Sequence, residues 1–373
     1  MQNFKNKFFF IIFVVVWGAI IVWNFVTPNQ SFSEAENRTL ASFPHFTVET
    51  LLDGDYMDGV DTYLNDHFAG RPYWVSGQSL MEYGLGKREI NNVFIGNNAL
   101  LGSTGQPDAD IAAANIAGVN AFAAQYKIPT YTLLIPSSTA VQPQNLPTFA
   151  EDWDEEGFIK TSNVAFGQGV TPVDAWTPLA AHSDEYIYYR TDHHWTTYGA
   201  SLAYAQLAGA MGLPNRAQEF TTQTVSTTFE GTYQSKTGFP LVQKDTIELY
   251  QAGQATTFSV FNGAEEVEYD SIFFPEFLQK KDQYSYFLGQ VQPYVTVYTG
   301  AGTGKKLLLF KDSYAHCLTP MLLADYDEIR LVDLRYLNGA NIGSLVQAEQ
   351  YDEALFLYSA DVFAHQKVSG KLQ

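Results

Sequence analysis

The chain has 373 residues, of which 46% are hydrophobic, 15% aromatic and 16% charged. This composition is typical of a globular protein with a sizeable core, and it excludes wholesale disorder. The formal net charge of -19 makes nucleic acid a poor partner for the bulk of the surface, whereas a neutral glycan or a small acyl donor meets no such repulsion. The single cysteine, Cys317, excludes an internal disulfide and favours a bacterial surface protein.

A long apolar run lies near the N-terminus. Phe8 to Val26 contains no charged residue and, at ~1.5 Å per residue in a helix, is long enough for the roughly 30 Å core of a bilayer. Lys5 and Lys7 precede it and would stay on the cytoplasmic side. We therefore expect 1–27 to form a cytoplasmic stub and an uncleaved, single-pass signal anchor in the cell membrane. Residues 28–373 would then form one extracytoplasmic domain. A cleaved signal peptide is the alternative, and the bulky residues at the end of the run disfavour it.

Apolar residues recur at helical or strand spacing through much of the remaining chain. In chain order, the pattern predicts a helix over 51–68 closed by Gly70 and Pro72, a hairpin over 93–101, a helix over 108–127, strands over 130–135 and 170–173, and a helix over 198–211. The segment about 216–300 is rich in Thr, Tyr, Phe and Gly, which predicts a mostly β insertion. The remaining elements are a strand over 305–310, a helix over 314–324, and strands over 329–332 and 354–357. Helices that alternate with short buried strands are typical of an α/β domain.

The first group of residues suited to catalysis is Thr191-Asp192-His193-His194-Trp195. If this stretch is extended, Asp192 and His194 share one face. A carboxylate beside an imidazole fixes the ring tautomer and stabilises the imidazolium that forms during general-base catalysis. The alternative is a loop histidine that caps the following helix.

The second group surrounds Ser313, at a turn where a predicted buried strand runs into a predicted helix. This geometry exposes a nucleophilic hydroxyl and directs backbone N–H groups toward a forming oxyanion. The alternative is an ordinary helix cap made by Asp312 or Ser313. Because both groups occur in one chain, we expect a triad in which Ser313 is the nucleophile, His194 the base and Asp192 the residue that orients it.

Other assignments of these residues stay open. Cys317 is either a second nucleophile or a small buried hydrophobe, and Asp312 is an alternative partner for the histidine. A Zn or Mn cluster is a further alternative, although its spacing matches no metal motif; it would use His182, Asp184, Asp192, His193 and His194. We expect neither a metal nor a cofactor.

The run Asp192-His193-His194-Trp195 resembles the signature of the bacterial DHHW protein family, which is similar to the alginate O-acetyltransferases and other SGNH-hydrolase-like enzymes. Further blocks that resemble the family are Ser33–Arg38 with Phe43-Pro44, Asp66–Arg71, Lys311–Ala315 and Val332–Tyr336. The resemblance extends from about Ser33 to the C-terminus. Two features differ: related enzymes tend to have Gly where this chain has Lys311, and the insertion at about 216–300 has no counterpart that aligns.

The resemblance implies an SGNH-hydrolase-like parallel sheet flanked by helices, with the Asp-x-His-Trp block ahead of the serine. It implies an O-acetyltransferase that modifies an extracellular or cell-wall polysaccharide through an acetyl-serine intermediate, with acetyl groups supplied by a membrane-bound O-acyltransferase. The alternatives are an acetylesterase with the same triad, a metal-dependent hydrolase, and a non-catalytic glycan-binding or assembly module. Tyr314, Arg335 and Trp195 are candidates for holding the oxyanion or the substrate. For Arg335, a structural salt bridge is the other expectation.

Overall fold

The computed structural model describes residues 2–261, 265–337 and 347–372. The chain divides into two compact units, of which the first is Met1–Lys87 with Ser235–Pro240 and the second is Arg88–Gln234 with Leu241–Gln373. The domain boundary expected after residue 27 stays a prediction.

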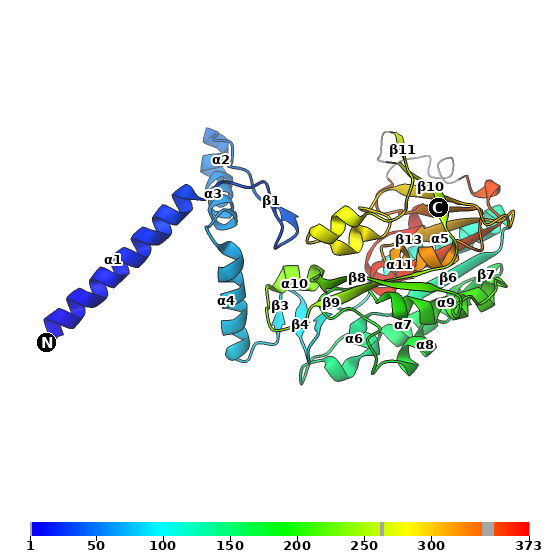
Figure 1. The fold of residues 1–373 in the computed structure, drawn as a ribbon, viewed down its shortest axis with the longest axis horizontal. Helices are drawn as coiled ribbons and strands as arrows, with labels where there is room; N and C mark the ends of the chain where they lie inside the picture. Colours follow the sequence, from blue (N-terminus) through cyan, green and yellow to red (C-terminus); the bar gives the residue numbers. More distant parts are fainter. Residues whose placement is uncertain (1, 262–264, 338–346, 373) are drawn as a thin grey trace. The chain divides into compact units, whose positions relative to one another are not determined.

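The first unit begins with helix α1 (Gln2–Val26) (Figure 1). Within it, Lys7–Val26 is the one helix in the described part of the chain that is long and apolar enough to cross a membrane, judged by length and composition. The polar side chain of Asn24 is satisfied locally. Its amide donates to the Ile20 carbonyl at 2.9 Å, and its oxygen accepts from the Ala69 backbone N–H at 2.9 Å.

Three helices complete this unit, after a short hairpin. The elements are β1 (Phe32–Ser33), β2 (Arg38–Thr39), α2 (Val48–Asp53), α3 (Asp55–Asp66) and α4 (Arg71–Gly84). The helix predicted over 51–68 is interrupted because Gly54 has a φ of 91°, a backbone conformation that residues other than glycine rarely adopt. Pro72 does not end a helix as expected; it lies in the first turn of α4, where the missing N–H costs nothing.

The second unit is built on an eight-stranded sheet (Figure 1). In spatial order the strands are β11 (Glu266–Tyr269), β10 (Ala255–Phe261), β12 (Tyr294–Thr299), β14 (Glu328–Val332), β13 (Lys306–Lys311), β15 (Glu353–Ser359), β6 (Thr130–Ile135) and β7 (Val170–Val173). The five strands from β14 to β7 are parallel, whereas β11, β10 and β12 join antiparallel, so the expectation of a parallel sheet is correct for only one part. Pro172 is tolerated in β7 because β7 is an edge strand.

The segment expected to be a β insertion supplies two kinds of strand. β10, β11 and β12 extend the central sheet directly, while β8 (Thr221–Phe229) and β9 (Asp245–Gln251) form a separate antiparallel pair. The hairpin expected over 93–101 is present as β4 (Val93–Ile95) and β5 (Leu100–Gly102), with β3 (Glu89–Ile90) beside β4.

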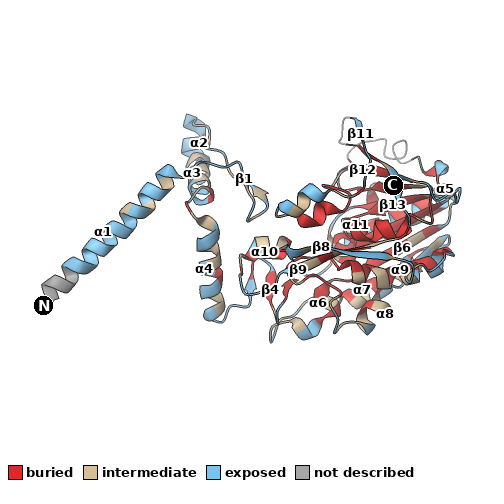
Figure 2. Cartoon of the chain, in the orientation of Figure 1, coloured by how far each residue is buried: buried red, intermediate tan, exposed pale blue. Residues whose placement is uncertain are grey.

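Helices cover both faces of the sheet, whose interior is buried (Figure 2). One face buries Leu307 and Leu309 against α8 (Trp176–Ala181) and α9 (Thr197–Met211). The opposite face buries Leu308 and Phe310 with α5 (Ala109–Tyr126), α7 (Glu155–Ala165) and α13 (Ala360–His365). This alternation along β13 is the two-residue period of a strand that is buried on both sides.

The helix expected over 314–324 is shorter than predicted. It consists of α11 (Ala315–Leu318) followed by a 3₁₀ turn over Thr319–Leu322 that contains Pro320. Two further short α-helices in the described residues are α6 (Ser138–Val141) and α10 (Thr232–Thr237).

Candidate active site

Ser313 lies at the carboxyl edge of the parallel strands, two residues after β13 ends and two before α11 begins. Ser313 is half-buried, in contrast to the strand before it, which is buried from Leu307 to Lys311. In open parallel sheets, this edge is where ligands usually bind, because the loops that follow neighbouring strands meet there.

The segment that carries the histidines is a narrow turn between two short extended stretches. Tyr188 and Trp195 form an antiparallel bridge, and the Tyr189 N–H donates to the His194 carbonyl at 3.2 Å. Asp192 and His193 therefore lie at the tip of the turn. Trp195 is completely buried, and its indole N–H donates to the Tyr314 carbonyl at 3.0 Å, which ties this turn to the turn after β13.

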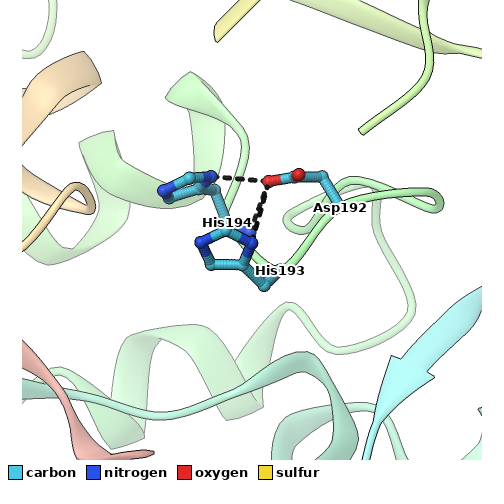
Figure 3. Close-up of side chains that lie close together, drawn as sticks. All are labelled: Asp192, His193 and His194. Carbon is cyan, nitrogen blue, oxygen red and sulfur yellow. Dashed lines mark hydrogen bonds and ion pairs between the residues drawn. The ribbon is translucent and has the colours of Figure 1, made fainter. Parts of the chain in front are cut away.

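The structure brings the three expected triad residues together in one chain of hydrogen bonds. His194 Nδ1 lies 2.5 Å from Asp192 Oδ1, and His194 Nε2 lies 2.7 Å from Ser313 Oγ. Figure 3 shows the carboxylate of Asp192 beside both neighbouring imidazoles. Because Nδ1 faces a carboxylate, it carries the proton, and Nε2 is left to accept from the serine hydroxyl.

Asp192 is held as a buried carboxylate by several donors. Burial by itself would raise the pKa of Asp192, but His193, His194 and the Thr232 N–H, at 2.7 Å from Oδ2, hold that pKa well below its usual range. Gly231 allows the backbone before Thr232 to approach Asp192 closely, because a Cβ at Gly231 would collide with the Asp192 side chain. The carboxylate therefore stays ionised at neutral pH and fixes the orientation of His194.

Tyr284 is part of the site, although no sequence motif marks it. Its ring stacks on the His194 ring, with centroids 3.9 Å apart and planes 15° apart, and its hydroxyl donates to the Ser313 carbonyl at 3.1 Å. Only 5% of Tyr284 is exposed. It therefore covers one face of the imidazole and is bound at the same time to the backbone of the proposed nucleophile.

Asp245 is a second residue that sequence reasoning missed. It is fully buried at the start of β9 and accepts hydrogen bonds from Thr191 Oγ1, the backbone N–H groups of Arg190 and Thr191, and the Tyr186 hydroxyl. Both this carboxylate and the ring of Tyr284 come from the 216–300 segment. Four donors converge on one side chain, which holds the residues that lead into Asp192.

The backbone N–H groups near Ser313 are not equally available for an oxyanion. The Tyr314 N–H donates to Asp312 Oδ1 at 3.0 Å, and the role of Tyr314 in holding an oxyanion or substrate stays a prediction. The Ser313 N–H donates to no acceptor among the described residues. The other oxygen of Asp312 accepts from the Ser359 N–H and hydroxyl, so Asp312 contacts the turn after β15 and not His194.

Arg335 is engaged by Asp333, as in the salt-bridge alternative. Its guanidinium donates to both carboxylate oxygens, at 2.9 and 2.7 Å. Asp333 also lies 3.7 Å from Nζ of the buried Lys311, and that Nζ donates to His316 Nε2 at 2.8 Å. Burial lowers the pKa of His316, and the nearby Lys311 charge lowers it further, so His316 is neutral and accepts from Lys311. Substrate binding by Arg335 stays a prediction.

The comparison with protein families agrees with this arrangement. The model of the DHHW protein family matches residues 36–126 and 166–332, which together make up more than half of the chain and include Asp192, His194 and Ser313. The chain belongs to the DHHW family. No curated protein matches its sequence.

Two proteins of known structure, the first two described below, share the fold of this DHHW protein at low sequence identity. A DHHW family protein from Eubacterium siraeum is 23% identical with a TM-score of 0.65, and the match covers 76% of this chain and 95% of the other. PatB1 from Bacillus cereus is 17% identical with a TM-score of 0.63 and coverage of 75% and 99%; a second PatB1 structure carries a sulfonyl adduct. The O-acetyltransferase domain of AlgJ from Pseudomonas putida is 16% identical, with a TM-score of 0.47 and coverage of 73% and 92%.

The residues of the alternative metal cluster lie in two separate places in the DHHW protein. Possible ligand atoms of Asp192, His193 and His194 lie within 4.8 Å of one another. His182 instead contacts Glu185, with Nδ1 2.8 Å from Oε1. A cation at the first group would compete with the proton that His194 shares with Asp192, so the donor set fits a hydrogen-bonded pair better than a metal centre.

Cys317 does not share the exposure of Ser313. Its side chain is completely buried, and burial raises the pKa of its thiol to about 12. Because the thiolate is the reactive form, this cysteine is inert at neutral pH. It occupies the position of a small core hydrophobe in the DHHW protein.

Proposed function

We propose that this DHHW protein is a membrane-anchored serine O-acyltransferase that moves an acetyl group onto an extracytoplasmic polysaccharide. The hydrogen-bond chain from Asp192 through His194 to Ser313 carries the proposal. Its distances match the roles of orienting acid, general base and nucleophile. Ser313 lies at the carboxyl edge of the parallel strands, where ligands usually bind in open α/β sheets, and this position supports the proposal.

In the first half-reaction, His194 Nε2 removes the proton from Ser313 Oγ while Oγ attacks the acyl carbon of the donor. The Ser313 N–H is the available donor for the oxyanion of the tetrahedral intermediate. When the intermediate collapses, the bond between the acyl carbon and the leaving group breaks. The leaving group takes the proton from His194, and Ser313 is left acetylated.

In the second half-reaction, a sugar hydroxyl gives its proton to His194 and attacks the acetyl carbon. The bond to Ser313 Oγ then breaks, and Oγ recovers the proton from His194. If water replaces the sugar, the same steps describe an esterase, so the outcome depends on how well the site positions the acceptor and excludes water. The anchor α1 would hold the enzyme beside a membrane-bound O-acyltransferase that supplies the acetyl group.

The decisive experiment is mass spectrometry of the full chain after addition of 4-nitrophenyl acetate. We expect an acetyl adduct on Ser313 that disappears in His194→Ala and Ser313→Ala. His182→Ala is the matched control, because it removes an imidazole that contacts Glu185 and is not part of the hydrogen-bond chain, and it should keep the adduct. Since one PatB1 structure carries a sulfonyl adduct, a sulfonyl fluoride is a second probe.

Two results would contradict the proposal. Wild-type protein without any adduct on Ser313 would favour a non-catalytic glycan-binding or assembly role, and activity that a chelator removes would favour a metal-dependent hydrolase. Adding an acetyl-accepting oligosaccharide to the acetylated enzyme then separates transfer from hydrolysis, because only a transferase yields acetylated sugar.

A further inference from the structure

The outward face of α4 is apolar, which is the reverse of the usual pattern for a helix on a protein surface. The other side of α4 is already in use: the Ser79 hydroxyl donates to the Thr237 carbonyl, and the Tyr83 ring packs on Phe239 at 5.0 Å between centroids. The large apolar side chains left exposed on α4 and just after it are Tyr73, Trp74, Leu80, Met81 and Leu85. Their exposed fractions range from 38% to 81%.

These five residues lie on a single face. At 100° per residue, they cluster opposite Ser79 and Tyr83, and Gly77 and Gly84 fall between them. A Cβ at either glycine would meet no atom of the described residues within 4 Å, and the five apolar side chains around these glycines are exposed. The charged residues of α4, Arg71 and Glu82, lie away from the face. Figure 2 shows α4 with exposed and intermediate residues along its length.

The start of α4 is bound to the end of the apolar helix α1. The Ala69 N–H donates to Asn24 Oδ1 at 2.9 Å, and Gly70, the residue before α4, lies under the ring of Trp23 so closely that a Cβ there would collide with it. Trp23 and Asn24 belong to the last turn of the apolar run Lys7–Val26. The first turn of α4 therefore lies at the level where that run ends.

From these contacts we propose that the face made by Tyr73, Trp74, Leu80, Met81 and Leu85 lies on the surface of the lipid bilayer. This inference rests on the part of the proposed function that places α1 across a membrane. Trp and Tyr are the side chains that prefer the boundary between headgroups and acyl chains, and here they occupy the first turn of α4, next to the end of the span. An uncharged apolar face with polar flanks is the pattern of a helix that lies along that boundary.

A fluorescent label tests the proposal in the full chain. The native thiol of Cys317 is buried, so cysteines introduced one at a time as Tyr73→Cys, Met81→Cys and Leu85→Cys in a Cys317→Ala background carry the environment-sensitive dye NBD selectively. The protein is placed at one copy per nanodisc of phosphatidylcholine, with or without spin-labelled lipid. We expect blue-shifted emission at all three positions, and loss of most of the fluorescence when the spin-labelled lipid is present.

Two control positions in the same unit separate the possible failures. Val16→Cys lies within α1 and must be quenched if α1 crosses the bilayer; without that quenching, the membrane anchor itself is wrong. Asp58→Cys lies on the exposed, acidic first turn of α3 and should show aqueous emission without quenching. If Val16→Cys is quenched but the three α4 positions behave like Asp58→Cys, the lipid-facing role of α4 is refuted.

Native membrane fractions provide the last comparison. If the α4 labels are aqueous in pure lipid nanodiscs but shielded in native membranes, a membrane protein covers the face instead of lipid, and that result also overturns the proposal. Because each disc holds one chain, quenching there cannot come from a second copy of the protein.

Discussion

Replacing Tyr284 tests whether the stacked ring positions His194. Tyr284→Phe removes only the hydroxyl that donates to the Ser313 carbonyl, and that carbonyl still accepts from the His316 N–H at 3.1 Å. One neutral hydrogen bond contributes about 1 kcal/mol, so we expect Tyr284→Phe to react within about fivefold of wild type. Tyr284→Leu removes the stack but keeps apolar volume in the site.

The ring contact with His194 is worth about 0.5–1.5 kcal/mol, and the middle of this range corresponds to a change of about fivefold in the population of the productive imidazole orientation. If the imidazole also shifts by ~1 Å, the loss of rate reaches about 100-fold. We therefore expect Tyr284→Leu to react between about fivefold and 100-fold more slowly. Tyr284→Leu should lower the free energy of unfolding by less than an aromatic-to-alanine substitution does, which typically costs about 3–5 kcal/mol.

The assay is the time course of Ser313 modification by a sulfonyl fluoride, followed by mass spectrometry, with the melting temperature of each variant as a parallel measurement. The positioning role requires that Tyr284→Leu lose rate while it remains folded. If folded Tyr284→Leu reacts at the wild-type rate, the ring serves only to fill the core and the reasoning fails.

Three further changes probe the surroundings of the site. Asp245→Asn should lower the free energy of unfolding by about 2 kcal/mol and slow the modification of Ser313, because it disturbs four hydrogen bonds. The control Asp184→Asn, at an exposed position, should change neither quantity. If Asp245→Asn lost rate at unchanged stability, the predicted structural role of Asp245 would be contradicted. Burial raises the pKa of Glu155 from 4.5 to about 8, so the native state keeps a proton that the unfolded chain releases. Stability should therefore fall as the pH rises from 4.5 to about 8, and chemical denaturation should show this slope vanish in Glu155→Gln but not in Glu156→Gln. Cys317→Ala should keep wild-type reactivity with 4-nitrophenyl acetate, and native protein at neutral pH should not react with a thiol reagent; rapid labelling would show that the thiol opens to solvent.

Local patterns were sufficient for most of the α/β unit. The strand over 130–135 and the strand over 170–173 have the predicted bounds, and the two motifs around His194 and Ser313 meet as expected. These predictions succeeded because burial on both faces of a parallel strand leaves a continuous apolar run, and because the turn after such a strand is short.

The errors arose where one glycine or one proline had two interpretations. Gly54 interrupts a helix whose apolar spacing continues through it, and Pro72 starts a helix at the place where a proline also fits a helix end. Periodicity does not distinguish these cases. The membership of β10 to β12 in the central sheet was likewise hidden, because antiparallel strands that join an edge have the same local pattern as strands in a separate sheet.

Tyr284 and Asp245 were missed for a different reason. Each lies far along the chain from the residues it contacts, and neither stands in a recognisable motif. A single tyrosine or aspartate in a β-rich segment carries no local signal of the imidazole or backbone groups that it will meet. Only the folded arrangement shows that these contacts exist.

The close approach of Gly231 to Asp192 has a practical consequence for anyone who wishes to reduce this protein to a minimal catalyst. Deleting residues 216–300 to leave a bare α/β core would remove the backbone donor at Thr232, the carboxylate of Asp245 and the ring of Tyr284 together. The segment expected to be an insertion without a counterpart lies within residues 166–332, which the DHHW family model matches, and shortening must spare it. Any exchange of this region between relatives has to carry a glycine at the point that touches the aspartate.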